Sequence, residues 1–181
     1  MTDIHGDTAA RLAALASSID SLLSADGAPD PHAIRQAIHD AFMPGNWLPQ
    51  AMCAPGDQSY VRHVLHGDPG GRFTIAALVW QQGQRSPVHA HHTWCAFSVV
   101  AGELLEEHFA YDPDAAAAAA TGSLRRKAGD GSSGTAGLHQ IHRVGNVRPE
   151  TAISIHVYGV AASEMSSGVN YVMPVVDMAI A

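Results

Sequence analysis

The first 45 residues place apolar side chains at helical spacing. Leucine and isoleucine recur every three or four positions, at Leu12, Leu15, Ile19, Leu22 and Leu23, which predicts one face of an amphipathic helix. Asp30-Pro31 is typical of an N-cap followed by proline at the first helical position. It precedes a second apolar stripe, Ile34, Ile38 and Phe42, that Pro44-Gly45 is expected to end. Residues 1–45 are therefore predicted to form α-helices that pack on the outside of the remaining chain.

After residue 55 the helical period gives way to short β-branched and aromatic runs. Glycine and proline separate these runs, which are QSYVRHVLH, RFTIAALVW, TWCAFSVVAGELLEEHFAY, HQIHRVGNV and TAISIHVYGV. Short strands with turn signals and no helices between them predict a mainly β fold, an antiparallel barrel of the jelly-roll type, over residues 56–176. A chain of 181 residues suits one domain, residues 1–181, with a sizeable core.

One region shows neither the helical spacing nor the strand pattern. Residues 112–136 hold an alanine run and a stretch rich in glycine and serine, on either side of SLRRK. Low complexity of this kind is typical of a long surface loop. We expect Arg125-Arg126-Lys127 to be solvated within it.

Composition excludes several classes of function. A net charge of −7, with only 10 lysines and arginines, argues against nucleic-acid binding. The chain holds no run of about 18 apolar residues that would span a membrane, and Asp3, His5 and Asp7 replace the basic start of a secretory signal. Two cysteines, Cys53 and Cys95, are too few for a disulfide framework and suit a reducing cytoplasm. The oligomeric state is left open.

Histidine is the residue type that points to chemistry, with 12 copies. In an extended His89-Ala90-His91-His92 segment, His89 and His91 share one face and His92 lies on the other. Neutral imidazoles in such a pair can bind divalent iron, manganese, nickel or zinc. A third ligand is available from His139 or His142, which are three positions apart and so face opposite ways on a strand.

The spacing of these residues resembles a known motif. Gly83, His89, His91, Cys95 and Gly102 follow the spacing of the first cupin motif, with Cys95 where the motif usually has glutamate. His142 and Asn146 resemble the end of the second motif. The set is similar to the thiol dioxygenases of the cysteine dioxygenase family, within the cupins. This resemblance implies a cupin-type barrel and an Fe(II) site formed by His89, His91 and His142.

Three further segments extend the resemblance over about residues 58–160. SIHVY resembles the family's serine–histidine–tyrosine triad, which implies Ser154, His156 and Tyr158 as catalytic residues. YVRH resembles the substrate-arginine segment, which implies that Arg62 binds the substrate carboxylate beside Tyr60. Cys95 stands near the position of a cysteine that cross-links to the triad tyrosine in some members, although those members place it one residue further from the second histidine. The sequence leaves that cross-link open.

The resemblance implies an Fe(II)-dependent enzyme that uses O2 to oxidise a small thiol carboxylate to its sulfinic acid. L-cysteine is the leading substrate because Arg62 is present. 3-Mercaptopropionate and mercaptosuccinate remain alternatives, and the second carboxylate of mercaptosuccinate would need a cation such as Arg143 or Arg148. Trp80 and Trp94 either contribute to a dry wall around the site or are ordinary core residues. The alternative classes are a cupin that binds metal without redox chemistry, as a sensor or binding module, and another cupin dioxygenase.

Overall fold

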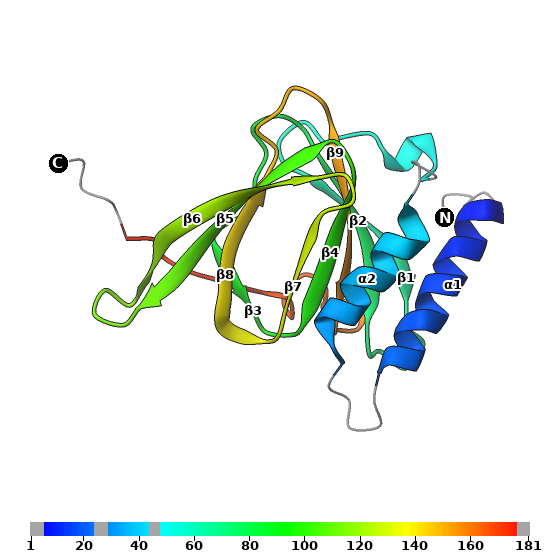
Figure 1. The fold of residues 1–181 in the computed structure, drawn as a ribbon, viewed down its shortest axis with the longest axis horizontal. Helices are drawn as coiled ribbons and strands as arrows, with labels where there is room; N and C mark the ends of the chain where they lie inside the picture. The colour runs from blue at the N-terminus through cyan, green and yellow to red at the C-terminus, as the bar shows by residue number, and fades with distance from the viewer. Residues whose placement is uncertain (1–5, 24–28, 44–47, 177–181) are drawn as a thin grey trace.

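The computed structural model describes residues 6–23, 29–43 and 48–176. Within these ranges two helices, α1 (Gly6–Leu22) and α2 (Pro31–Phe42), precede a series of short strands (Figure 1). The strands are β1 (Val61–Gly67), β2 (Thr74–Trp80), β3 (His89–His91), β4 (Cys95–Ala101), β5 (Glu103–Asp112), β6 (Ala117–Lys127), β7 (Gly131–Gly134), β8 (Gly137–Gly145), β9 (Ala152–Tyr158) and β10 (Asn170–Val172). Two 3-10 turns, Gln50–Met52 and Ala162–Glu164, complete the elements.

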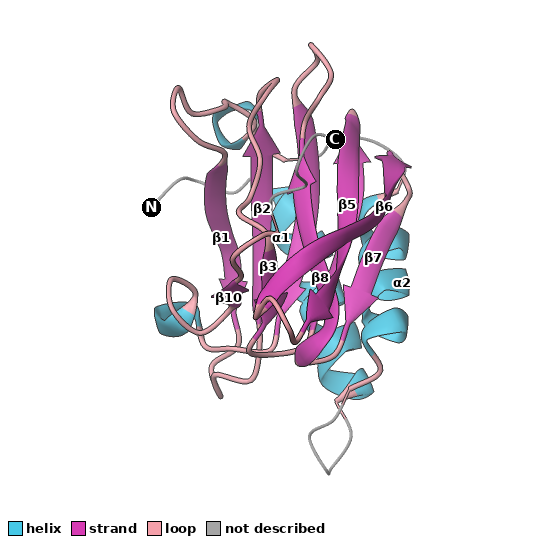
Figure 2. Ribbon diagram, turned by 90° about the vertical axis from the view of Figure 1, so that its left-hand side faces the viewer, coloured by secondary structure: helices cyan, strands magenta, loops and turns pink. Residues whose placement is uncertain are grey.

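The strands form two five-stranded antiparallel sheets. One has the order β1-β2-β9-β4-β7 and the other the order β10-β3-β8-β5-β6. The two sheets face each other in a jelly-roll-like arrangement (Figures 1 and 2), and hydrogen bonds between the described strands do not close them into one barrel. The predicted fold class, mainly β and jelly-roll-like with N-terminal helices packed outside, is confirmed.

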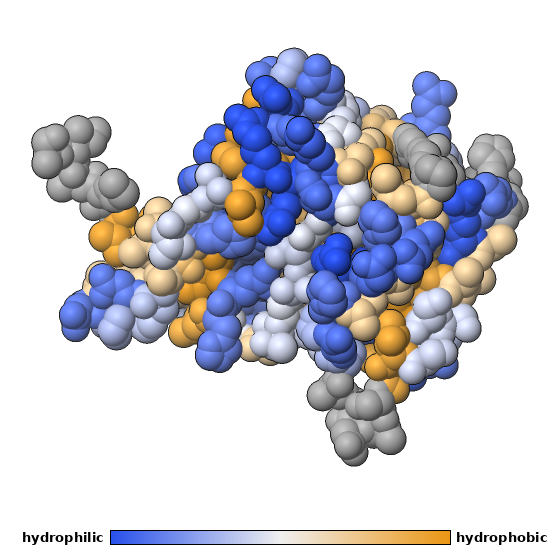
Figure 3. Space-filling model, in the orientation of Figure 1, coloured by the Kyte–Doolittle hydropathy of each residue, from blue (hydrophilic) through white to orange (hydrophobic). Residues whose placement is uncertain are grey.

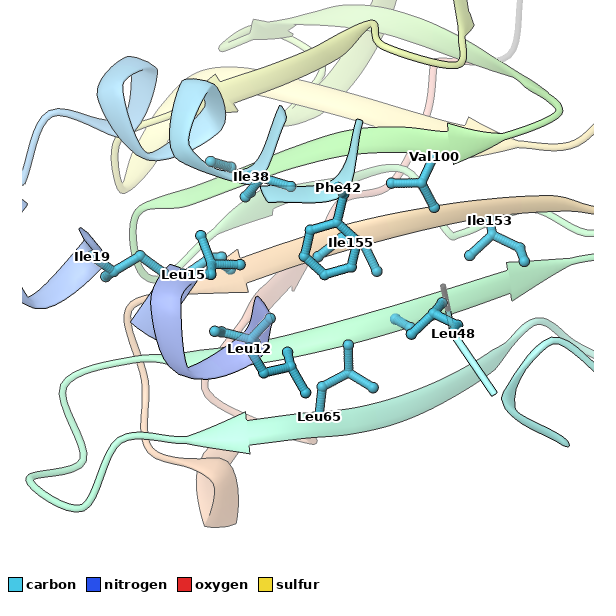
Figure 4. Packing of buried hydrophobic residues seen from close by; sticks show 14 of the residues in the cluster. Leu12, Leu15, Ile19, Ile38, Phe42, Leu48, Leu65, Val100, Ile153 and Ile155 are labelled. Atoms are coloured by element: carbon cyan, nitrogen blue, oxygen red, sulfur yellow. The ribbon is translucent and has the colours of Figure 1, made fainter. Parts of the chain in front are cut away.

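The helices cover the outer face of the first sheet, as Figure 1 shows. Their predicted stripes are buried there: Leu15, Ile19 and Phe42 retain at most 1% of their exposed area. Figure 4 shows these side chains with Ile153 and Ile155 of β9, which belong to the same buried cluster. Burying such side chains stabilises the fold by about 1.5–3 kcal/mol each, so this layer fixes the outer face of the sheet and leaves its inner face for other groups.

The start of α2 follows the prediction in detail. The Asp30 side chain accepts a hydrogen bond from the His32 backbone N–H at 2.9 Å, and Pro31 is the first helical residue. The helix ends at Phe42 with Met43 as its C-cap. The predicted Pro44-Gly45 break lies outside the described residues.

The predicted long loop over residues 112–136 is wrong. Residues 117–127 form β6, which pairs along its length with β5 in an extended hairpin, and residues 131–134 form β7. Arg125 and Arg126 lie on β6 and pair with Glu103 and Glu106 of β5. Cross-strand pairing therefore outweighs the weak strand propensity of the alanine-rich sequence.

The last strand, β10, completes the second sheet from the C-terminal side. It pairs antiparallel with β3, so that Asn170 lies opposite His91 and Val172 opposite His89. Backbone bonds from His92 N–H to Val169 O, and from Met173 N–H to Val88 O, extend the pairing at both ends. The segment after β9 thus returns to the strand that carries two of the predicted metal ligands.

The surface shown in Figure 3 is mostly hydrophilic, with apolar side chains in separate small groups. Exposed large apolar residues include Tyr111 and Leu124 on the β5–β6 hairpin and Tyr171 and Val172 on β10. None of the described helices has the length and hydropathy needed to cross a membrane.

The two motif glycines, Gly83 and Gly102, differ in what surrounds them, and this gives a test of the fold. Both have positive φ, of 85° and 72°. A Cβ at Gly102 would lie 2.9 Å from the Ala152 Cα, whereas at Gly83 nothing lies within 4 Å. We expect Gly83→Ala to cost about 1–2 kcal/mol, the penalty of the left-handed conformation, and Gly102→Ala to cost clearly more.

The measurement is the free energy of unfolding in urea for both variants and the unsubstituted protein. Equal losses for the two variants would contradict a steric constraint between Gly102 and the start of β9.

Candidate metal centre

His89, His91 and His142 come together between the two sheets. Each offers a ring nitrogen, and these nitrogens lie within 4.8 Å of one another. The side chains come from adjacent strands, because β3 pairs with β8 and His89 lies opposite His142. All three are buried, with exposed fractions of 6%, 3% and 3%. This is the only such group of histidine, cysteine or acidic residues within the described ranges.

Two of the three imidazole rings, those of His89 and His142, are oriented by a hydrogen bond from Nδ1. His89 Nδ1 donates to the carbonyl of Pro87 at 2.9 Å, and His142 Nδ1 donates to the carboxylate of Glu106 at 2.8 Å. A proton on Nδ1 leaves the lone pair of Nε2 free to bind a metal. The buried Nδ1 of His91 has no hydrogen-bond partner.

The environment keeps His89 and His91 uncharged. Burial, together with the nearby His142, lowers the pKa of His89 to about 4 and that of His91 to about 2. Neutral imidazole is the form that binds a divalent metal ion. The donor set, its spacing and the hydrogen bonds on Nδ1 of His89 and His142 therefore fit a metal ion held by three histidines.

Glu106 is a site residue that the sequence analysis missed. Its carboxylate is completely buried, accepts a hydrogen bond from Arg126 Nε at 2.8 Å and forms an ion pair with Arg126 Nη2 at 2.7 Å. Burial alone raises the pKa of this carboxyl, but the bond from His142 and the Arg126 guanidinium outweigh it and hold the pKa at about 2. A signal was present in the sequence: Glu106 shares a strand face with the fully buried Leu104, where a charge needs a partner.

Strand β9 carries a second group of polar residues. Ser154, His156 and Tyr158 alternate along the strand and point to the inner face, with Ser154 Oγ 2.8 Å from His156 Nε2 and Tyr158 Oη 2.9 Å from His156 Nδ1. Burial, followed by the charge of Arg62, lowers the pKa of His156 well below its usual value. Burial also raises the pKa of Tyr158. The histidine is therefore neutral and the tyrosine remains a phenol.

Arg62 and Tyr60 line the same small cavity as the three histidines and the Ser154–His156–Tyr158 group. Arg62 Nη1 donates to the Met165 carbonyl at 2.8 Å, which anchors the guanidinium, while its buried Nε has no partner. Trp80, Leu78 and Phe97 form part of the apolar wall. A guanidinium that lines a cavity and keeps a buried N–H without a partner favours an anionic ligand there.

Cys95 and Tyr158 are direct partners across β4 and β9. The backbone bond from Gly159 N–H to Trp94 O identifies them as a pair without hydrogen bonds between their own backbones, the kind in which side chains approach most closely. Both side chains line the cavity. Burial raises the pKa of the Cys95 thiol to about 12, so it is protonated at neutral pH.

The remaining predicted residues lie away from the cavity. His92 and His139 are exposed. Trp94 is partly buried and packs against the core between the helices and the first sheet, so Trp80 lines the cavity and Trp94 does not. Arg143 and Arg148 do not line the cavity and instead form ion pairs with Glu107 and Glu103.

Comparison with known proteins shows the family to which this chain belongs. The family described as Cysteine dioxygenase type I matches residues 32–166. Cysteine dioxygenase type 1 of Homo sapiens is 28% identical over 130 residues, which cover 68% of this chain and 62% of the human protein. The Pongo abelii enzyme of the same name gives the same figures. The matched region thus spans less than two thirds of these relatives.

Among solved structures, a conserved protein with a double-stranded β-helix domain from Klebsiella pneumoniae aligns with a TM-score of 0.48 and 21% identity, over 62% of this chain and 82% of that chain. A cupin family protein from Methanocaldococcus jannaschii aligns with a TM-score of 0.44 and 12% identity, over 61% of this chain and 89% of that chain. The family assignment does not rest on these alignments.

The contact between Glu106 and His142 predicts a specific effect on metal binding. Glu106→Gln removes the negative charge that orients the His142 ring, so we expect metal affinity to fall by about 10- to 100-fold. Glu107→Gln is the matched control, because Glu107 pairs with Arg143 and does not contact the cluster. Affinity is measured by competition with a chelator of known strength. Equal affinities for the two variants would contradict a role for Glu106 at the metal.

Proposed function

This chain belongs to the cysteine dioxygenase type I family, and from that premise we propose that it is an Fe(II)-dependent thiol dioxygenase. Its proposed reaction combines a small thiol carboxylate with O2 to give the sulfinic acid, with L-cysteine as the leading substrate. One observation carries the proposal: Arg62, with an unpartnered buried N–H, lines the same cavity as the three-histidine cluster. A carboxylate held by Arg62 places the rest of a small molecule beside that cluster.

The three histidines would hold the iron, with no carboxylate among the described residues joining them directly. Bound Fe(II) would supply the redox chemistry that adds both atoms of O2 to the thiol sulfur without an external reductant. Neutral histidines leave the site with the full charge of the metal, which favours an anionic sulfur donor from the substrate. Glu106 orients His142 from behind and is itself held by Arg126.

Arg62 positions the substrate. Its planar guanidinium matches the geometry of a carboxylate, and the Met165 carbonyl fixes one of its nitrogens. Tyr60 lies beside it and stacks on Trp80, with ring centroids 4.2 Å apart. A short substrate bound here cannot reorient freely, which is how positioning contributes to rate.

Tyr158 provides a hydroxyl group inside the cavity. Because burial raises its pKa, the phenol keeps its proton at neutral pH and can donate a hydrogen bond to the substrate or to oxygen. His156 holds the hydroxyl in place from Nδ1. Phe97 stacks on the His156 ring at 4.9 Å with an interplanar angle of 14°, which fixes the plane of the imidazole.

Cys95 enters the proposal as the neighbour of Tyr158. The close pairing of the two residues supports a thioether like that of some family members, formed by loss of hydrogen from the thiol and the ring to an oxidant such as O2. Such a bond would restrain the Tyr158 ring without changing its contact with His156.

The cavity favours a substrate with one carboxylate. Arg62 is the only arginine or lysine among the described residues that line it. Arg143 and Arg148 lie outside the lining and pair with Glu107 and Glu103. The second carboxylate of mercaptosuccinate would therefore be buried without a cation, which is costly. No acidic side chain lines the described cavity to pair with the ammonium of cysteine, so 3-mercaptopropionate remains the alternative substrate.

The test is oxygen consumption by anaerobically iron-loaded protein with L-cysteine, 3-mercaptopropionate and mercaptosuccinate. We expect uptake of one O2 per sulfinate formed with L-cysteine or 3-mercaptopropionate, and little with mercaptosuccinate. The product is identified by mass spectrometry. Full iron loading without uptake for any of these thiols would overturn the proposed function.

The role of Arg62 is tested by the variant Arg62→Gln. Loss of a charge-assisted pair is expected to lower kcat/KM for thiol carboxylates by about 10- to 100-fold, because the carboxylate loses its anchor. Cysteamine, which has no carboxylate, should keep its own rate, and metal content should not change. Arg148→Gln is the control for loss of an arginine outside the cavity. An equal loss with cysteamine would contradict carboxylate binding by Arg62.

A further inference from the structure

The Ser154–His156–Tyr158 group continues to a fourth residue. Trp80, on the neighbouring strand β2, donates its indole N–H to Ser154 Oγ at 3.0 Å. The chain of hydrogen bonds therefore runs from Trp80 Nε1 to Ser154 Oγ, to His156 Nε2, and from His156 Nδ1 to Tyr158 Oη. Its members are 1%, 0%, 7% and 5% exposed, so water does not provide easy alternative partners.

The indole fixes the direction at one end of this chain. An indole N–H is a donor only, so Ser154 Oγ must accept from Trp80. The serine hydroxyl has one proton of its own to donate. Among the described residues, the only acceptor that contacts this oxygen is His156 Nε2.

The neutral His156 ring carries one proton, which permits two arrangements. In the first arrangement, Nε2 carries the proton and donates to Ser154 Oγ, and Nδ1 accepts a hydrogen bond from the Tyr158 hydroxyl. The serine hydroxyl proton then has no acceptor. If Ser154 donates to Nε2, the ring proton sits on Nδ1 and is donated to Tyr158 Oη. Each arrangement leaves one hydroxyl proton without an acceptor in the chain: that of Ser154 in the first and that of Tyr158 in the second. Ser154 is fully buried and does not line the cavity, so its unpaired proton would be costly, whereas Tyr158 lines the cavity and can donate to a ligand there. The second arrangement is therefore favoured.

We propose that Trp80 is a positioning residue: it holds His156 in the tautomer with its proton on Nδ1, so that Tyr158 accepts from His156 and directs its own hydroxyl proton into the cavity. The use of that proton in thiol oxidation rests on the proposed function, whereas the tautomer does not. Phe97, stacked on the imidazole, keeps the ring plane in line with both neighbours.

Trp80 is placed so that its N–H can be removed with little change in packing. Its ring stacks on Tyr60 with an interplanar angle of 26°. Trp80→Phe keeps an aromatic ring for that contact and deletes the donor. Trp94→Phe is the matched control, because Trp94 packs against the apolar core beneath the helices and takes no part in the hydrogen bonds that link the four residues.

The experiment is a long-range proton–nitrogen NMR spectrum of the full chain with labelled histidines, loaded with zinc, which is diamagnetic. The signals of His156 are assigned by their loss in His156→Gln. We expect a protonated Nδ1 and an unprotonated Nε2 in the unsubstituted protein and in Trp94→Phe, and a shift toward protonated Nε2 in Trp80→Phe. A proton on Nε2 in the unsubstituted protein, or an unchanged tautomer in Trp80→Phe, would overturn the proposal.

Kinetics provide a second readout through a double-mutant cycle. Trp80→Phe should lower kcat by about 10- to 100-fold, in the lower range for loss of a positioned proton donor, with little change in KM. If Trp80 acts through Ser154, adding Trp80→Phe to Ser154→Ala should cause no further loss. Additive losses would overturn the positioning role. If the tautomer behaves as expected and no thiol is oxidised by the iron-loaded protein, the inference stands and the proposed function fails.

Discussion

The space between the two sheets holds polar side chains from which water is largely excluded, and the arrangement of the site depends on how these groups satisfy one another. His142 is held by Glu106, which is held by Arg126. His156 is held between Ser154 and Tyr158. A buried polar group without a partner costs free energy. Removing one member of either chain would therefore leave its neighbour unpaired, and these contacts set the orientation of the His142 and His156 rings.

The first sheet makes this interior possible because its two faces differ. On β9, Ile153, Ile155 and Val157 pack under the helices, while the alternate positions carry the polar group. The apolar layer supplies the burial that stabilises the sheet, and the inner face is then free to carry residues that contribute less to folding. Helices α1 and α2 therefore support the site without touching it.

The sequence predicted what depends on local alternation. Two-residue spacing placed His89 with His91, and Ser154 with His156 and Tyr158, because strand geometry fixes which side chains share a face. It missed Glu106 because that contact depends on the register of β5 against β8, which joins residues 36 positions apart. It missed β6 because strand pairing, rather than the propensity of an alanine run, determines the structure of residues 117–127. The link from Trp80 to Ser154 likewise requires the pairing of β2 with β9.

The similarity to the family ends at residue 166, but the cavity does not. Asn170, on β10, lies opposite His91 and forms part of the lining. The short strand that carries it lies at the edge of its sheet. A chain built in this way can vary the outer wall of its cavity through its C-terminal segment alone. Evolution could thus alter which molecules enter while the strands that hold the histidines stay unchanged.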